Sequence, residues 1–237
     1  MKKLFKIYCL SGLLLAVASC DKEKDKEKNM SRMFTVTVQN VSTPGLVNTT
    51  RAMGAVPLSP GAWAIFTGND PMFTEGKMAD IGTERIAEDG AASTKDAAMG
   101  ALSNVRDHGI FKTAAGPLLP GESAQFSFNA SPGDRLQFET MFVQSNDWFY
   151  SFSGGIGLEL FNAKTPATGD VTSALKLYDA GTEADTPPGT GPDQKPVQAT
   201  DNKGPTESVV VTVASVRYPE FTIPATNADI KVTITAN

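Results

Sequence analysis

The sequence of 237 residues predicts an all-β fold, an antiparallel β-sandwich of about eight strands with one or two short helices and long loops. Two observations support this prediction. Short stretches rich in β-branched and aromatic residues recur between clusters of Gly, Pro, Asn and Asp. In addition, Phe34, Val36 and Val38 alternate with polar residues, which is the pattern of a strand with one buried face.

The first 20 residues are predicted to be an export signal. Three lysines give a basic start, an apolar centre follows, and residues 17–20 (VASC) form a small-residue cleavage site. The apolar run is too short to span a bilayer stably. Because this site ends on Cys20, it resembles the lipobox of bacterial lipoproteins, which implies that residues 1–19 are removed and that Cys20 carries acyl chains. An ordinary secretory signal with an incidental cysteine is the alternative.

Residues 20–32 are predicted to be a flexible tether that begins at the lipidated cysteine. Acids and lysines alternate from Asp21 to Lys28, a composition that buries nothing. The run is similar to the acidic signals that direct some bacterial lipoproteins to the outer face of the outer membrane. We therefore expect a lipid-anchored outer-membrane protein exposed at the cell surface, with a periplasm-facing lipoprotein as the alternative.

The sandwich is expected to occupy residues 33–237. The stretches with strand character are residues 33–39, 62–67, 124–128, 136–143, 157–161, 171–178, 207–216 and 229–235. Residues 70–104 are instead rich in Ala, Met, Glu, Lys and Arg, and we expect one or two short helices within residues 73–89. Residues 186–205, rich in Pro and Gly, are predicted to be a long loop.

Two acidic loops at the ends of apolar runs form the candidate site. They are residues 145–149 (SNDWF) and 178–185 (YDAGTEAD). Asp179 and Glu183 flank Gly181, which can adopt the left-handed backbone of a tight turn and lets both carboxylates point to one spot. If Asp147 faces the same spot, three carboxylates converge and need a cation, and flexible all-oxygen loops suit Ca²⁺ better than Mg²⁺. Solvated surface turns are the alternative.

The order of these motifs resembles the spondin N-terminal domain family. SNDWF at 145–149, GLEL at 157–160 and DAGTE at 179–183 stand in the family's order at similar spacing, and AWAIFTG at 62–68 and FTEG at 73–76 are similar to its earlier segments. The resemblance covers residues 33–237. It implies a calcium-binding β-sandwich resembling a C2 domain, with Asp147, Asp179 and Glu183 as the metal ligands. One difference is Glu183, where animal members have Asp.

Two further side chains, those of Trp148 and His108, are interpreted without a direct role in a functional site. Trp148, beside Asp147, is interpreted as a hydrophobic plug that holds the acidic loop on the sandwich, and stacking on a ligand is the alternative. His108 is the only histidine, and its neighbours Asp107 and Gly109 indicate an exposed turn. A single histidine argues against a Ser-His-acid or Cys-His catalytic site and against a metal site with several histidine ligands.

The charge balance bears on the partners. Removal of the signal with its three lysines leaves 18 basic against 26 acidic residues, a balance of −8, which argues against nucleic acid as a partner. The resemblance to the spondin family implies a non-enzymatic adhesion or ligand-binding module, which the scarcity of catalytic residues also favours. We expect a monomer whose partner is an extracellular protein or a glycan. The alternative is a carbohydrate-binding or glycan-processing surface lipoprotein that uses the same acidic loops.

Overall fold

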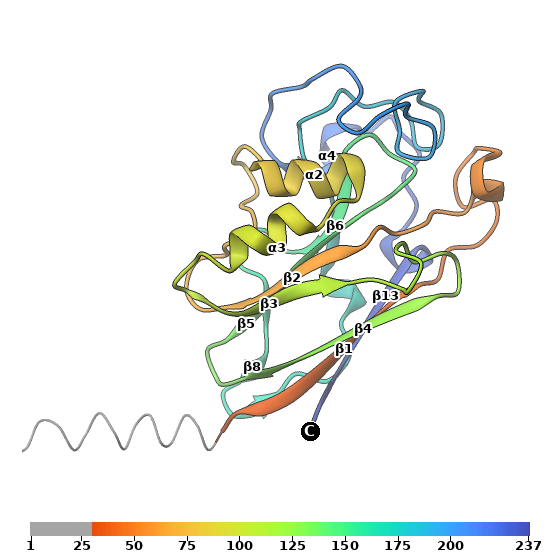
Figure 1. Ribbon diagram of the computed structural model, residues 1–237. Coiled ribbons are helices and arrows are strands. Elements are labelled where there is room, and N and C mark those ends of the chain that lie inside the picture. Colours follow the sequence, from red (N-terminus) through yellow and green to blue (C-terminus); the bar gives the residue numbers. More distant parts are fainter. Residues whose placement is uncertain (1–29) are drawn as a thin grey trace, which may run out of the picture.

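The computed structural model describes residues 30–237, which fold into two stacked β-sheets with helices on the outer face of the second sheet (Figure 1). The first sheet has four strands in the order β10-β13-β1-β4. Their bounds are β1 Arg32–Asn40, β4 Ser123–Ala130, β10 Gly169–Asp170 and β13 Ile230–Ala236. Each neighbouring pair in this sheet is antiparallel.

The second sheet has seven strands in the order β12-β11-β6-β5-β2-β3, with β7 beside β5. Their bounds are β2 Gly61–Phe66, β3 Val105–Phe111, β5 Arg135–Met141, β6 Trp148–Phe152, β7 Leu158–Glu159, β11 Leu175–Asp179 and β12 Thr212–Val213. These pairs are antiparallel as well, and β8 (Phe161–Asn162) pairs with β9 (Thr165–Pro166) in a separate ribbon. The predicted all-β sandwich with long loops is therefore confirmed.

Three short α-helices lie within the described residues, together with short 3-10 turns. The helices are α2 Ile81–Asp89, α3 Ser93–Met99 and α4 Ala214–Arg217, and the 3-10 turns are η1 Arg51–Gly54, η2 Thr172–Ala174 and η3 Thr226–Ala228. The Asp80 side chain caps α2 by accepting the Thr83 N–H, and Gly90 ends the helix with a left-handed φ of 66°. Within residues 30–237 no helix is both long and apolar enough to cross a membrane.

The main core lies between the two sheets. Phe34, Val36 and Val38 point inward from β1, as their alternation predicts, and β4 and β13 contribute the same alternation in register. On the facing sheet, Trp63 stacks on Phe126 with ring centroids 4.9 Å apart. Burial of these aromatic rings stabilises the sandwich.

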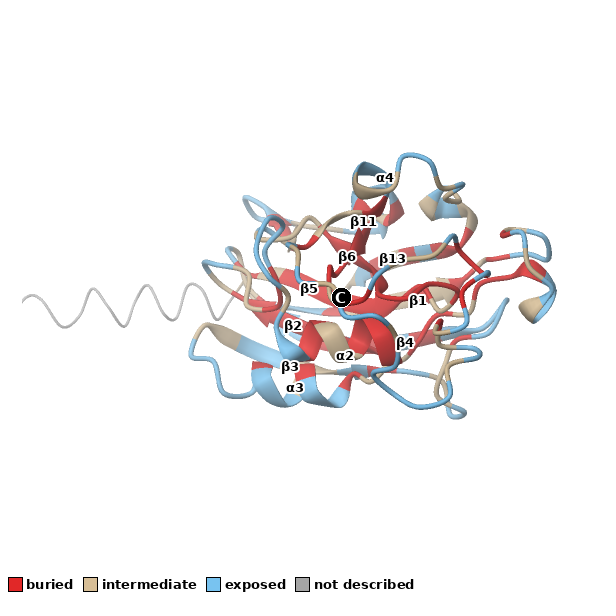
Figure 2. Ribbon diagram, turned by 90° about the horizontal axis from the view of Figure 1, so that it is seen from above, coloured by how far each residue is buried: buried red, intermediate tan, exposed pale blue. Residues whose placement is uncertain are grey.

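A second, smaller core lies between the second sheet and its helices. Ala62 and Ala64 face α2 and α3 from β2 and pack in one cluster with Ile86 and Met99. Small side chains at these strand positions let the helices approach the sheet closely. Because both faces of the sheet are covered, all six residues of β2 are buried, and Figure 2 shows buried positions running along the strands of the second sheet in the middle of the molecule.

Three sequence predictions about local structure were wrong. Residues 207–216 contain only the two-residue strand β12 and the start of α4, because an open loop precedes β12. The turn predicted around His108 is part of β3, where the His108 Nδ1 lies 2.7 Å from Asp96 Oδ1 on α3. Finally, residues 172–174 at the start of the predicted strand 171–178 form the 3-10 turn η2, and β11 begins only at Leu175. The helix expected within residues 73–89 is present as α2, and α3 lies beyond that range.

Other boundaries agree with the sequence prediction more closely. The loop predicted at residues 186–205 has no helix or strand in the structure. The predicted signal sequence, the lipidation site Cys20 and the tether up to residue 29 lie outside the described residues.

Candidate metal centre

The candidate site lies where β6 and β11 run side by side. These strands are antiparallel, and Asp179 at the end of β11 is opposite Trp148 at the start of β6. Asp147 precedes β6 directly, so this register makes the backbones of Asp147 and Asp179 neighbours. Asp185 joins them from the following loop, and the three residues offer one carboxylate oxygen each within 4.8 Å of one another. We call these three residues the Asp triad.

The loop after β11 folds back over Asp147. Gly181 has a φ of 70°, and a Cβ at this position would lie 2.5 Å from the carbonyl oxygen of Val209, so the turn requires glycine. The backbone N–H groups of Thr182 and Glu183 donate to Asp147 Oδ2 at 2.7 and 3.1 Å. Asp147 Oδ1 is buried and has no hydrogen-bond partner. Asp147 is thus fixed by one oxygen and offers the other to the triad.

Asp185 is oriented in a similar way. The indole Nε1 of the buried Trp148 donates to Asp185 Oδ2 at 2.5 Å, while Asp185 Oδ1 is buried without a hydrogen-bond partner. Among the residues that the structure describes, neither oxygen of Asp179 accepts a hydrogen bond, and Asp179 Oδ1 lies 3.2 Å from Arg217 Nε in an ion pair. Within residues 30–237, four buried carboxylate oxygens of the Asp triad are therefore without a hydrogen bond.

The electrostatics of the Asp triad favour protons or a cation. Burial, followed by the charge of Asp179, raises the pKa of Asp147 well above its usual value. Burial also raises the pKa of Asp179, and burial together with the neighbouring Asp147 and Asp179 raises the pKa of Asp185 to about 10. Arg217 is shared with Glu207, whose Oε2 lies 3.9 Å from Arg217 Nη1, so it does not balance three carboxylates.

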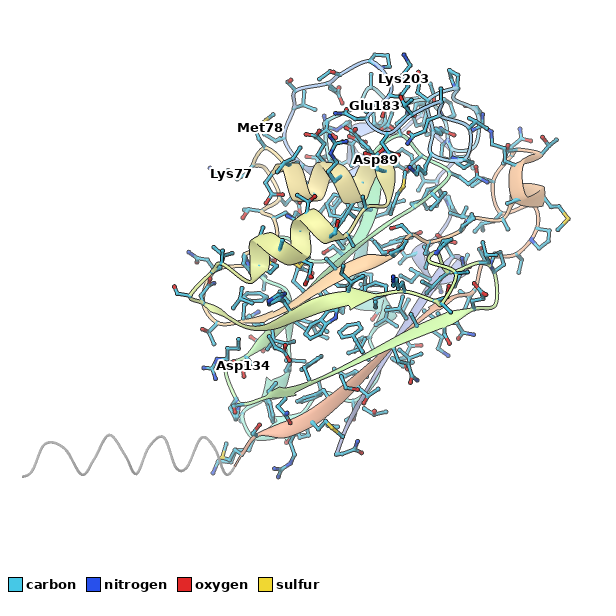
Figure 3. The ribbon with its side chains drawn as sticks, in the orientation of Figure 1. Lys77, Met78, Asp89, Asp134, Glu183 and Lys203 are labelled. Carbon is cyan, nitrogen blue, oxygen red and sulfur yellow. The ribbon has the colours of Figure 1, made fainter. Side chains whose placement is uncertain are left out.

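Glu183 is not a member of the Asp triad, although the sequence pattern placed it with Asp147 and Asp179. Its carboxylate turns to Asn146, whose Nδ2 donates to Glu183 Oε1 at 2.7 Å. Figure 3 shows Glu183 near Asp89 at the end of α2. Burial and the charges of neighbouring acids, Glu88 foremost among them, raise the pKa of Glu183 to about 7. The main chain of Glu183, and not its side chain, contacts Asp147.

Sequence reasoning missed Asp185, although one signal pointed to it. A buried tryptophan needs an acceptor for its indole N–H, and Asp185 is the nearby acid that supplies one. Spacing alone favoured Glu183 because it lies closer to Gly181. Which of the two acids joins Asp147 and Asp179 depends on the path of the loop after residue 183.

Comparisons of the chain with models of protein families and with curated proteins give no match. The resemblance to spondin N-terminal domains therefore depends on the motifs at residues 145–149 and 179–183.

The residues of the Asp triad fit a hard cation. All offered ligand atoms are carboxylate oxygens, and they are held close together by hydrogen bonds to their other oxygens or by strand pairing. Oxygen ligands of this kind suit Ca²⁺ and Mg²⁺, and poorly suit metals that prefer nitrogen or sulfur. Bound there, a cation would balance charge that the protein alone leaves uncompensated.

Proposed function

We propose that this chain is a non-enzymatic, calcium-binding β-sandwich module of the spondin type, anchored to the bacterial outer membrane through Cys20 and serving in adhesion or in binding of an extracellular ligand. The observation that supports it most is the set of buried carboxylate oxygens without hydrogen bonds in the Asp triad. The motif resemblance and the export signal supply the family and the location in this proposal.

Calcium is preferred over magnesium because of the loops that hold the ligands. Asp185 lies on a loop, and Asp147 and Asp179 lie at strand ends, so the ligand set is not a rigid octahedral cage. Ca²⁺ accepts six to eight oxygens at variable geometry, whereas Mg²⁺ demands near-ideal octahedral ligation. Backbone carbonyls and water would complete the shell.

Burial favours an ion over a sugar at these carboxylates. Asp147 and Asp179 are both 0% exposed, so a sugar ring has no access to them, whereas a single ion fits between three oxygens. A glycosidase also needs its two carboxylates on either side of an open cleft. The glycan-processing alternative therefore gains no support from the Asp triad.

We predict that calcium stabilises the folded protein through Asp185 and not through Glu183. At a free calcium concentration a hundredfold above Kd, the free energy of unfolding should rise by about 2.7 kcal/mol relative to the protein in chelator. Millimolar calcium is appropriate, because extracellular sites bind at about 10⁻⁴–10⁻³ M. Thermal unfolding of the wild type, Asp185→Asn and Glu183→Gln with calcium and with chelator measures this effect.

The matched pair of variants decides between the two ligand sets. Asp185→Asn should lose the calcium response because it removes a triad carboxylate, while Glu183→Gln should keep it. Glu220→Gln, which changes an exposed acid elsewhere, is the control. A wild type without a response to several millimolar calcium would refute the site, and an equal response in Asp185→Asn would place the ion elsewhere.

We also predict that Cys20 is the lipid-bearing residue. Metabolic labelling of cells with a radioactive fatty acid should mark the full-length protein, and Cys20→Ser should abolish the label because no other cysteine follows the cleavage site. The matched control is Cys9→Ser, which changes the cysteine inside the signal and should retain the label. Label that persists in Cys20→Ser would refute the assignment of Cys20 as the lipid-bearing residue.

A further inference from the structure

A second site candidate is an apolar cavity of about 370 Å³ that none of the Asp triad residues lines. Its walls include Pro57, Pro60, Pro117, Met141 and Val143. Arg51 and Ala52 of η1 lie on one side, and Lys195 and Pro196 of the loop 186–205 lie on another. A volume of this size lies in the usual range of small-molecule sites, which are mostly apolar with a few placed polar groups.

The cavity carries one cation without a counter-charge. Arg51 donates from Nη1 to Gln194 Oε1 at 3.0 Å and from Nη2 to the Gly191 carbonyl oxygen at 2.7 Å. Both acceptors are neutral, and Arg51 forms no ion pair with a carboxylate of residues 30–237. These hydrogen bonds fix the guanidinium in place and leave its charge uncompensated.

The other charged residues of the lining are already paired. Lys195 lies 2.7 Å from Asp201 and 4.0 Å from Asp89, and Asp89 also accepts from Arg85 at 2.9 Å. The cavity as a whole therefore has an excess of positive charge at Arg51, in a chain whose net charge is −5. An anionic group on a ligand is the complement that this arrangement lacks.

A polar group of the lining also lacks a partner. Gln144 lines the cavity and is 0% exposed, and its Nε2 donates to the carbonyl oxygens of Arg51 and Ala55 at 3.2 and 3.1 Å. Its Oε1 is buried and accepts no hydrogen bond from the described part of the chain. A buried acceptor without a hydrogen bond destabilises the folded protein, so a hydrogen-bond donor on a ligand would remove this cost.

The backbone next to the cavity is strained. Ala52 and Met53 are two successive non-glycine residues in the left-handed region, with φ of 47° and 55°. The Met53 side chain is 74% exposed, so burial does not compensate this conformation. Strained residues of this kind persist where the surroundings impose them, often at ligand clamps. Here they directly follow Arg51, and Arg51 and Ala52 both line the cavity.

We propose that this cavity binds a small amphipathic carboxylate, with its apolar body between the proline, methionine and valine side chains and its carboxylate on Arg51. A hydrogen-bond donor on the apolar body pairs with Gln144 Oε1. The site is separate from the Asp triad, so the inference does not depend on calcium.

The test uses indole-3-butyrate, which combines a carboxylate, an apolar ring and an N–H donor, and its neutral analogue indole-3-butyramide. Titration calorimetry with the purified protein should show the acid binding at least about tenfold more tightly than the amide, as expected for a charge-assisted hydrogen bond. Arg51→Gln should remove this preference. Arg32→Gln, which changes an exposed arginine that also has no carboxylate partner, is the matched control and should keep it.

A third variant tests the cavity itself. Val143→Trp fills the apolar space and should abolish binding of both compounds, while an unchanged melting temperature shows that the variant is folded. Three results would overturn the proposal: equal affinity of the wild type for acid and amide, a loss of preference in Arg32→Gln as large as that in Arg51→Gln, or no binding of the acid at millimolar concentration. Wild-type affinity in Val143→Trp would place the ligand outside this cavity.

Discussion

Replacement of Trp148 with Ala is expected to lower the free energy of unfolding by about 3–5 kcal/mol, the usual cost of removing a large buried aromatic side chain. Trp148 is 0% exposed, and its ring packs against Phe142, Tyr218 and Phe221 with centroid distances of 5.9, 6.3 and 6.3 Å. Because Tyr218 and Phe221 come from a part of the chain about 70 residues away and are packed on other elements, the cavity left behind cannot collapse easily. Urea unfolding of both proteins measures the change.

Trp148 also links the core to the Asp triad, so its substitutions should affect calcium binding. Trp148→Phe keeps an aromatic ring but loses the Nε1–H that orients Asp185, and it should reduce the stabilisation by calcium. The matched control is Trp63→Ala, which removes a tryptophan that stacks on Phe126 elsewhere in the core. It should cost comparable stability and leave the calcium response intact.

Two outcomes would contradict this account of Trp148. A loss of less than about 1 kcal/mol in Trp148→Ala would mean that the ring is not the packed plug that the structure shows. A normal calcium response in Trp148→Phe would mean that the indole hydrogen bond does not position Asp185. Full burial of the indole already argues against the alternative that Trp148 stacks on a ligand.

The second large effect is a fall in stability as the pH rises from about 4.5 to about 7, caused by Glu139. This residue of β5 is 0% exposed beneath α2 and α3, and burial raises its pKa from 4.5 to about 7 although Lys95 opposes the shift. The Lys95 Nζ lies 3.7 Å from Glu139 Oε1, but donates at 2.7 Å to Asp80 and to the Met72 carbonyl oxygen. The positive charge of Lys95 is therefore shared between Glu139 and Asp80.

The direction of this pH effect follows from proton binding by Glu139 in the folded and the unfolded state. Between pH 4.5 and 7 the folded protein holds the Glu139 proton and the unfolded chain has lost it, so raising the pH favours unfolding. The contribution of Glu139 is fully present below the unfolded pKa and is lost as the pH passes the folded pKa. With about 1.4 kcal/mol per pKa unit, the loss amounts to roughly 3 kcal/mol.

Glu139→Gln isolates this contribution from that of the other buried acids. The amide is similar in shape and does not titrate, so the variant should lose less stability than the wild type between pH 4.5 and pH 7.5, by roughly 3 kcal/mol. Urea unfolding at both pH values gives the difference, with Glu220→Gln, an exposed acid, as the control. Parallel pH profiles of the wild type and Glu139→Gln would show that folding does not raise the pKa of Glu139.

Much of the fold can be predicted from local patterns. Alternation in β1 determines which face of that strand is buried, since side chains of a strand point to opposite sides. The Pro- and Gly-rich composition of residues 186–205 excludes a regular element for a similarly local reason. Residues 207–216 show the limit of this reasoning. Their valines and threonines favour a strand, but only residues 212 and 213 find a partner in β11.

The site could be predicted only in part. Asp147 and Asp179 were recognisable as loop acids, and Gly181 as the glycine of the turn between acids, because turn chemistry is local. The choice between Glu183 and Asp185 was not local. It depends on hydrogen bonds of Asn146 to Glu183 and of Trp148 to Asp185, which join residues 37 positions apart in each case.

By itself, then, the sequence determined the β class, the burial pattern of β1 and the presence of two acidic loops, since each follows from side-chain period or turn preference within a few residues. The tertiary structure decided which strands pair, which carboxylates meet and which charges remain uncompensated. Arg51 illustrates the difference: it lines an apolar cavity, and only the packing of η1 against the loop 186–205 pairs its guanidinium with neutral acceptors. Such arrangements depend on long-range contacts, whose energies no local pattern of residues contains.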